Sequence, residues 1–361
     1  PVGPLLMQTQ IPLVDNSTYT WHHVNPMAFL YHLCTLSGSQ SDFLRSCTAT
    51  GPANLVLYHD ESSTGNVLHP DHPREMVNFY WSFKELPPWY KSRKLGWYAY
   101  GFLPSKIVAE ACGGLSSICG RVVKNFFGGQ AGLTGGIMLP GRDGKFAFNA
   151  VMGFFVMDEK AHKLTWSVKG ASGAKCCFNC KNIIRCEASK VQGHAYLRHV
   201  SCHKPGEWDQ HTVESFVDMA DKLQLCAVMR PKELERYETS FGLKYDPLAL
   251  PWNLEVRTWC NPITCGYWDA YHVFLCSGGL AQFHLNSFIL ELEAHSVDAS
   301  TLDDFQKQIV WPISLQHQLP KEFFNSRTVR AVDAHIKAFA KETLCAVYVV
   351  VMFIKLILQK R

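Results

Sequence analysis

Apolar and aromatic runs in the first half of the chain predict three consecutive β-strands. "NLVLYHD" (54–60) is apolar and rich in strand-forming residues, and "MVNFYWSFKEL" (76–86) is aromatic and ends before Pro87 and Pro88. "LGWYAYGFLP" (95–104) repeats this pattern and closes on a proline. Proline interrupts a strand because it lacks a backbone N–H, so the prolines mark the ends of the second and third runs.

A helix follows, and a pair of strands follows the helix. Residues 105–127 have helical spacing of apolar positions, with Ser105 as a candidate N-cap and one face formed by Ile107, Val108, Ala111 and Cys112. "TGGIMLP" (134–140) and the run 145–160 read as strands joined by the turn sequence "GRDG". We expect the second of these strands to end on Asp158.

The remaining pattern is mostly helical. Within residues 1–50 we expect one short helix at 25–37. Beyond residue 160 the spacing predicts helices at about 211–241, 269–295, 302–310 and 328–358.

This order predicts an α/β fold with a ribonuclease-H-like mixed sheet. In that architecture the first strand and the strand after the helix lie side by side, which would bring Asp60 and Asp158 together. Paired carboxylates suit Mg²⁺ or Mn²⁺, and such ions support phosphodiester chemistry. The alternative is that Asp60 and Glu61 mark an ordinary exit from a strand into a turn.

The cysteines indicate a reducing compartment and a zinc site. The chain has 14 cysteines, several of them in apolar runs, and we expect most to be reduced buried thiols. Cys177 and Cys180 form a C-x-x-C pair, which can place two thiolates on one zinc ion. For the other ligands we favour Cys202 and His211, with His199 as a substitute. Free thiols and a redox site are the alternatives.

Composition and charge indicate a soluble protein with a hydrophobic core. The mildly positive net charge permits nucleic-acid binding but does not require it. The 361 residues are 47% hydrophobic and 18% charged, with a net charge of +4. "PWYKSRKLGW" (88–97) interleaves Lys91, Arg93 and Lys94 with aromatic residues, which suits contacts to the DNA backbone or a solvated turn. The apolar stretch 344–358 is shorter than the roughly 20 residues of a membrane span, so we expect a buried helix or strand and no membrane partner.

"WDAYH" places Asp269 and His272 three residues apart, on one face of an expected helix. An N-cap aspartate beside a polar histidine is the alternative to a functional pair.

Together these motifs resemble a transposase family. From Asp158 the chain reads D-x9-V-K-G-x-x-G-x-x-x-C-x-x-C, which resembles the second-aspartate region of CACTA (En/Spm)-type and Kyakuja–Dileera–Zisupton DNA transposases, and of transposase-like proteins abundant in dinoflagellate genomes. "LVLYHD" is similar to their first-aspartate strand, and "WDAYH" to their D-x-x-H element. The resemblance covers about residues 52–345.

The resemblance implies a nuclear enzyme that cleaves and joins double-stranded DNA at transposon ends, with homo-oligomers among its expected states. Asp60 and Asp158 would hold Mg²⁺ or Mn²⁺, Cys177 and Cys180 would bind structural zinc, and Asp269 with His272 would have a supporting role. The boundaries that follow are a flanking segment at 1–50, a ribonuclease-H-like core at 51–166, a zinc-binding insertion at 167–212, and a helical region at 213–361 that we expect to be truncated.

The third acidic ligand of that family has no counterpart in its usual context. Glu291, Glu293 and Glu342 come too early in the chain for that pattern. We therefore expect an incomplete or inactive catalytic domain. The alternatives are a non-catalytic, zinc-stapled module that binds DNA or protein, and a ribonuclease-H-like exonuclease, whose third and fourth acids should lie closer together.

Overall fold

The computed structural model forms two compact units, Pro1–Tyr267 and Trp268–Arg361, which we describe separately. It describes residues 3–63, 75–129, 132–170, 173–175, 177–184, 200–202, 204–276, 278–331 and 334–359. Each unit has its own cluster of buried hydrophobic side chains.

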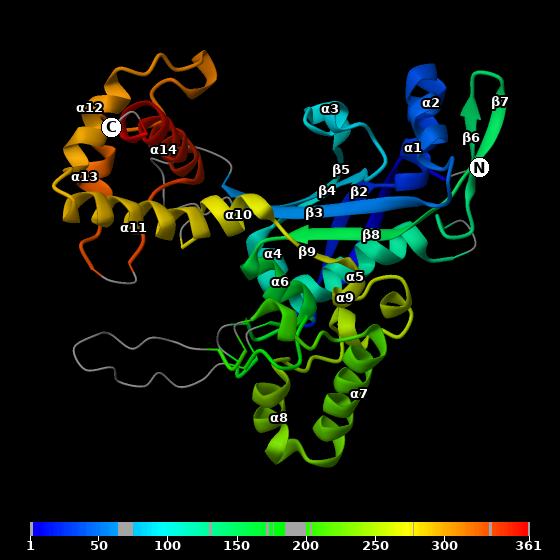
Figure 1. The fold of residues 1–361 in the computed structure, drawn as a ribbon. Coiled ribbons are helices and arrows are strands. Elements are labelled where there is room, and N and C mark those ends of the chain that lie inside the picture. Colours follow the sequence, from blue (N-terminus) through cyan, green and yellow to red (C-terminus); the bar gives the residue numbers. More distant parts are fainter. Residues whose placement is uncertain are drawn as a thin grey trace. The chain divides into compact units, whose positions relative to one another are not determined.

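A five-stranded mixed sheet organises the first unit (Figure 1), so the predicted α/β class is confirmed at this level. Its strands are β3 (Ala53–Ser63), β4 (Glu75–Phe83), β5 (Tyr98–Pro104), β8 (Ala150–Met157) and β9 (Gly266–Trp268). They lie in the order β5-β4-β3-β8-β9. β4 pairs antiparallel with both β3 and β5, whereas β8 runs parallel to β3.

The single helix predicted over 105–127 is wrong, because two helices occupy this region. Helix α4 (Ser105–Glu110) stops before Gly113, and α5 (Gly114–Phe127) begins after it. Gly113 has φ +75° and Gly114 has φ +54°, values that glycine adopts without the strain of a Cβ atom. Ser105 is also not the N-cap: Pro104 occupies that position, with no side-chain cap.

The predicted strand pair is a hairpin, but its second strand is divided. β6 (Ile137–Gly141) pairs with β7 (Gly144–Phe148) across the "GRDG" turn, as expected. The extended run then breaks at Asn149 and enters the main sheet as β8. Asp158 lies one residue beyond β8 and begins the next helix.

Three N-terminal elements were not predicted. β1 (Leu6–Pro12) and β2 (Thr18–Val24) form an antiparallel hairpin, and α2 (Gly38–Cys47) follows the expected helix α1 (Pro26–Leu36). Trp21 anchors the hairpin, since it is 1% exposed and its indole N–H donates to Phe102 O.

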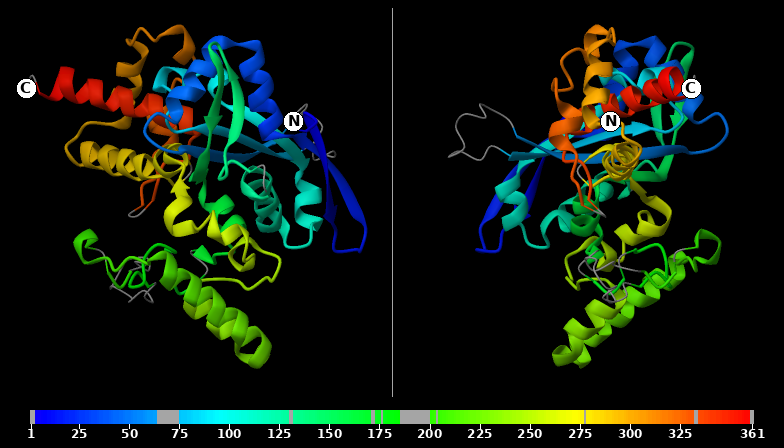
Figure 2. Two further views of the ribbon diagram at one scale, coloured as in Figure 1. Left: turned by 90° about the vertical axis from the view of Figure 1, so that its right-hand side faces the viewer. Right: turned by 60° about the vertical axis from the view of Figure 1, so that its left-hand side comes forward.

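Helix α5 covers one face of the main sheet (Figures 1 and 2). Its buried side chains include Val122, Val123 and Phe126, and the Phe126 ring meets Trp81 of β4 at 5.2 Å. Trp81 pairs with Leu57 of β3, and Leu57 pairs with Phe155 of β8. Because side chains alternate along a strand, Tyr58 and Val156 belong to the opposite face.

Five further helices are described in the first unit. They are α3 (Pro88–Lys91), α6 (Glu159–Trp166), α7 (Val213–Met229), α8 (Leu234–Phe241) and α9 (Pro262–Cys265). The helix predicted over 211–241 is therefore two helices.

The second unit is helical, as predicted, but the single helix predicted over 269–295 is two helices. It contains α10 (Ala270–Leu275), α11 (Leu280–Ala294), α12 (Ala299–Lys307), α13 (Phe323–Arg327) and α14 (Ala340–Phe353). The apolar C-terminal stretch forms α14, whose Ala346, Val349 and Phe353 are buried. The helix predicted over 328–358 is wrong at its start, because the described residues between 328 and 339 are not helical. One stretch of the described chain, Ala270–Ala294, is long and apolar enough to cross a membrane by composition alone, a weak criterion that buried core helices also meet.

Candidate metal-binding carboxylates and cysteine-rich segment

Asp60 lies near the end of β3, on the sheet face opposite α5. It pairs with Asn78 of β4. One carboxylate oxygen accepts a hydrogen bond from the Tyr58 hydroxyl at 3.1 Å, and the other accepts from the Glu61 backbone N–H at 2.8 Å. These two bonds fix the carboxylate while leaving oxygen lone pairs for a further ligand.

The parallel pairing of β3 with β8 brings Asp158 to the level of Asp60. Tyr58 pairs with Val156 in the last pair of this register, so Asp60 and Asp158 each follow that pair by two residues. The backbone of Asp158 is still extended, with φ −77° and ψ 178°. Both aspartates therefore lie toward the same end of the two central strands, with Asp158 just beyond β8 at the start of α6.

Asp158 also caps helix α6. Its Oδ1 accepts from the Ala161 backbone N–H at 2.7 Å. Within the described part of the chain Oδ2 takes no hydrogen bond, so it is available to a cation.

An ion pair lies close to Asp158. Lys160 Nζ lies 2.8 Å from Glu61 Oε2, and both side chains reach solvent. The hydrogen bond to Lys160 lowers the pKa of Glu61, while that bond and the Asp158 charge raise the pKa of Lys160. A cation is thus already drawn to this cluster of acids.

A buried polar layer lies beneath the aspartates, and the sequence analysis missed it. His59 is 4% exposed and its Nε2 bonds to Thr165 Oγ1 at 3.1 Å. Burial lowers the pKa of His59 to about 4, although the Asp158 charge acts in the opposite direction. His59 is therefore neutral near pH 7. Strand alternation could have revealed it, since a residue between Tyr58 and Asp60 must face the core.

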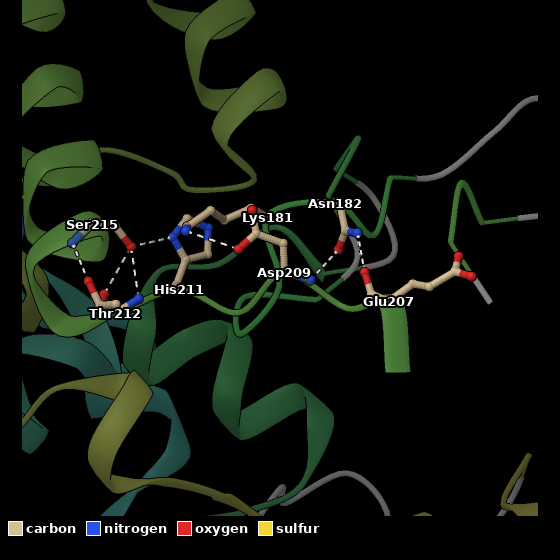
Figure 3. Close-up of polar contacts among 7 residues, drawn as sticks. All are labelled: Lys181, Asn182, Glu207, Asp209, His211, Thr212 and Ser215. Carbon is tan, nitrogen blue, oxygen red and sulfur yellow. Dashed lines mark hydrogen bonds and ion pairs between the residues drawn. The ribbon is translucent and has the colours of Figure 1, made fainter. Parts of the chain in front are cut away.

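Two backbone hydrogen bonds form a short antiparallel ladder in the cysteine-rich segment. Lys181 N donates to Asp209 O at 2.7 Å, and His211 N donates to Asn179 O at 2.8 Å, so the C-x-x-C turn runs beside His211. Figure 3 shows the side-chain bonds that reinforce this pairing, including Lys181 with Asp209 at 3.1 Å. Cys180 is buried, and Cys177 is partly exposed.

His211 is suited to bind a metal through Nε2. Ser215 Oγ donates to Thr212 O at 3.0 Å, so it accepts from the Nδ1–H of His211, also at 3.0 Å (Figure 3). This leaves the lone pair on Nε2. Burial lowers the pKa of His211 to about 4, and Lys175 and Lys181 contribute in the same direction.

The predicted zinc ligands do not form a complete site among the described residues. No group of three or more His, Cys, Asp or Glu side chains there is placed to hold one metal ion. Cys202 is tied to another part of the segment, because Ser201 N donates to Ile184 O at 2.8 Å. His199, the substitute ligand, lies outside the described residues. Zinc binding by Cys177, Cys180, Cys202 and His211 thus stays a prediction.

Asp269 and His272 form a local pair in the second unit. Asp269 is the N-cap of α10, since it accepts from Tyr271 N at 2.8 Å. Its other oxygen lies 2.7 Å from His272 Nδ1. The capping alternative therefore accounts for both residues.

The candidate third acids have structural partners. Glu291 lies 3.2 Å from His295, and Glu293 lies 2.8 Å from Arg330. Glu342 accepts from the Phe339 backbone N–H at the start of α14. None of these residues is therefore assigned to the metal site.

The predicted DNA-binding residues lie on the loop between β4 and β5. Arg93 and Lys94 are exposed, and Lys91 is half-buried. The Lys91 ammonium donates to Lys84 O, and the Arg93 guanidinium lies 5.7 Å above the Trp89 ring.

Comparison with known proteins adds no identification. No family model matches the chain, and no curated protein matches it at a significant level.

Proposed function

We propose that the first unit is a transposase-like nuclease domain, in which Asp60 and Asp158 bind Mg²⁺ or Mn²⁺ for phosphodiester cleavage and strand transfer on DNA. The observation that supports the proposal is the parallel β3–β8 register, in which Tyr58 pairs with Val156 and each of these residues precedes one of the two aspartates by two positions. Carboxylate oxygens are the ligands that such hard cations prefer.

The strand order supports a ribonuclease-H-like core. Three antiparallel strands are followed by helices and then by a strand parallel to the first, in the order β5-β4-β3-β8-β9. The first and fourth of these strands are neighbours at the centre of the sheet. This is the arrangement that the sequence-based hypothesis requires for Asp60 and Asp158 to cooperate.

The chain's own residues hold and tune the carboxylates. The Tyr58 hydroxyl and the Glu61 N–H orient Asp60, and the Ala161 N–H orients Asp158. A bound divalent ion would supply Lewis-acid stabilisation of charge on the phosphate oxygens and activate a nucleophile. Lys160 places a cation beside the acids, where it can attract the DNA phosphate.

Conservative charge removal tests this proposal. We expect Mn²⁺ titration by calorimetry to show binding that is lost in Asp60→Asn and in Asp158→Asn, since each change removes one anionic ligand. Metal-dependent nicking of supercoiled plasmid should be lost in the same variants. Asp143→Asn, in the exposed β6–β7 turn, is the matched control and should change neither readout. Undiminished Mn²⁺ binding in both test variants would contradict the proposal.

A zinc-stapled binding module without catalysis is the second candidate. The backbone ladder that places neutral His211 beside the C-x-x-C turn favours this candidate. Cysteine sulfur and neutral histidine nitrogen are the atoms that bind structural zinc. In this case zinc should copurify with the protein, and Cys177→Ser or His211→Ala should lower its zinc content. DNA or protein binding would then persist in Asp60→Asn without nicking.

A further inference from the structure

The loop that carries the predicted DNA-binding cations also presents a tryptophan to solvent. Trp89, in α3, is 54% exposed although it is among the largest apolar side chains. Its neighbours hold it in place: the Phe43 ring meets it at 5.9 Å and the Tyr90 ring at 5.8 Å, both edge-on. An exposed tryptophan supported in this way retains ring surface for a ligand.

The loop around Trp89 is rigidly anchored. Tyr90 is 5% exposed, and its hydroxyl accepts from the Gln40 amide. The Trp97 indole N–H donates to Lys91 O at 3.0 Å, and Ser82 Oγ donates to Gly96 O at 2.6 Å. The Lys91 ammonium donates to Lys84 O, so we assign Lys91 to holding the loop and not to binding a ligand. Trp89 and Arg93 are therefore preorganised, which lowers the entropic cost of binding.

The positive charges near Trp89 favour an anionic partner. From residue 86 to residue 104 the sequence has three cations and no acid. The nearest acid on the neighbouring α2, Asp42, is 3.1 Å from Arg142 and is neutralised by it. The Arg93 guanidinium lies over the Trp89 ring and so presents a planar cation next to an aromatic surface.

We infer that Trp89 and Arg93 form a stacking platform for unpaired bases of single-stranded DNA, with Lys94 contacting the backbone. An aromatic ring beside planar cationic groups is the combination that binds single strands without sequence preference. In a duplex the base faces are stacked on one another, so the platform would discriminate between single- and double-stranded DNA. The choice of DNA as the ligand rests on the proposed function, whereas the platform itself rests on the loop geometry.

Fluorescence anisotropy with a labelled thymidine oligonucleotide of about 16 nucleotides tests the platform. Trp89→Ala in the full chain should weaken binding about 5- to 150-fold, while Trp89→Phe should retain most of the affinity because a phenyl ring keeps a stacking face. Arg93→Lys should also weaken binding, since lysine keeps the charge without the planar group. Binding of a blunt duplex should change much less in Trp89→Ala.

Trp208→Ala is the matched control. Trp208 is also exposed, at 41%, but it lies between Glu207 and Asp209, so its loss should not alter DNA affinity. Equal single-strand affinity in Trp89→Ala and the unsubstituted chain would overturn the inference and point to a protein partner for this surface. If Trp89→Ala loses single-strand binding while Asp60→Asn binds Mn²⁺ normally, the platform stands and the proposed nuclease fails. The reverse pair of results would retain the nuclease and reject the platform.

Discussion

At the scale of single residues, Asp158 combines a structural and a proposed chemical role that substitutions can separate. Its Oδ1 caps α6 through Ala161 N, while Oδ2 is available to a cation. Asparagine caps a helix about as well as aspartate, but it removes the negative charge. Asp158→Ala should lower the free energy of unfolding by about 1 kcal/mol, whereas Asp158→Asn should leave it nearly unchanged. Urea denaturation measures this difference.

Divalent-metal affinity should respond differently to the same two changes. Both variants lose the anionic oxygen, so both should lose Mn²⁺ binding although only the alanine variant is destabilised. Mn²⁺ affinity that survives in Asp158→Asn would show that this residue acts only as a cap.

The buried His59 predicts how acid affects stability. Its folded-state pKa is about 4, below the ordinary value of 6.5, because burial disfavours the charged ring. Between these values the unfolded chain binds a proton that the folded protein does not bind, so stability falls as the pH drops from about 6.5 toward 4. The contribution of one such histidine is about 1.4 kcal/mol per pH unit within this window.

Replacing His59 isolates that contribution. His59→Gln keeps a donor for Thr165 and cannot titrate, so the difference in unfolding free energy between pH 7 and pH 5 should be smaller than in the unsubstituted chain. Urea denaturation at the two pH values provides the comparison. An unchanged difference would mean that His59 is not buried as a neutral ring.

At the scale of elements, the α3 loop depends on a glycine that no other residue can replace. A Cβ atom at Gly96 would lie 2.7 Å from Lys91 Cα and still closer to Tyr90 O, both backbone atoms that cannot move aside cheaply. Gly96→Ala should therefore destabilise the protein by roughly 1–3 kcal/mol, as overpacking does. It should also weaken single-strand binding through Trp89.

Gly120 provides the matched control for that substitution. It lies within α5, and a Cβ atom there would meet nothing within 4 Å. Gly120→Ala should raise stability by about 0.5–1 kcal/mol, because alanine loses less conformational freedom in a helix. Thermal unfolding of both variants measures the opposite signs. Equal destabilisation by the two changes would contradict the geometry of the α3 loop.

Secondary-structure elements were predicted well where the hydrophobic periodicity agreed with the positions of turn-forming residues. The strands at 54–60, 76–86 and 95–104 were recognisable because each is β-rich and bounded by turn residues. The β1–β2 hairpin was not, since its stability depends on burial of Trp21 against distant strands, which no local pattern encodes. The break at Asn149 was also missed, because β7 and β8 are both extended and differ only in their pairing partners.

The candidate site was predictable in part for a related reason. An aspartate near the end of a hydrophobic strand is visible in the sequence, and the strand order then implies which two strands are neighbours. To predict the polar layer of His59 and Thr165, one must know which residues face α5 and α6. To predict the role of Lys160, one must know how the chain turns after β8.

At the scale of the whole molecule, the two units have separate hydrophobic cores. The aspartates, the cysteine-rich segment and the Trp89 platform all belong to the first unit. Asp269, His272 and the candidate third acids belong to the second. A substitution in one core should therefore reveal whether the second unit contributes a ligand to the metal site.

Phe324→Ala makes this test. Phe324 is fully buried in the core of the second unit, so its truncation should cost about 3–5 kcal/mol there. Calorimetry should show two unfolding transitions, of which only one shifts to lower temperature. Mn²⁺ affinity should be unchanged at a temperature between the two transitions, where the second unit is unfolded and the first is folded, because Asp60 and Asp158 both belong to the first unit.

Phe155→Ala in the core of the first unit is the reciprocal variant, since Phe155 is also fully buried. It should shift the other transition and weaken Mn²⁺ binding with it. If Phe324→Ala weakened Mn²⁺ binding as well, a group on the second unit would have to complete the metal site. The missing third acid would then be sought among its glutamates, with Glu291, Glu293 and Glu342 changed to Gln one at a time. Unchanged binding in Phe324→Ala would instead confine the metal site to the sheet that carries both aspartates.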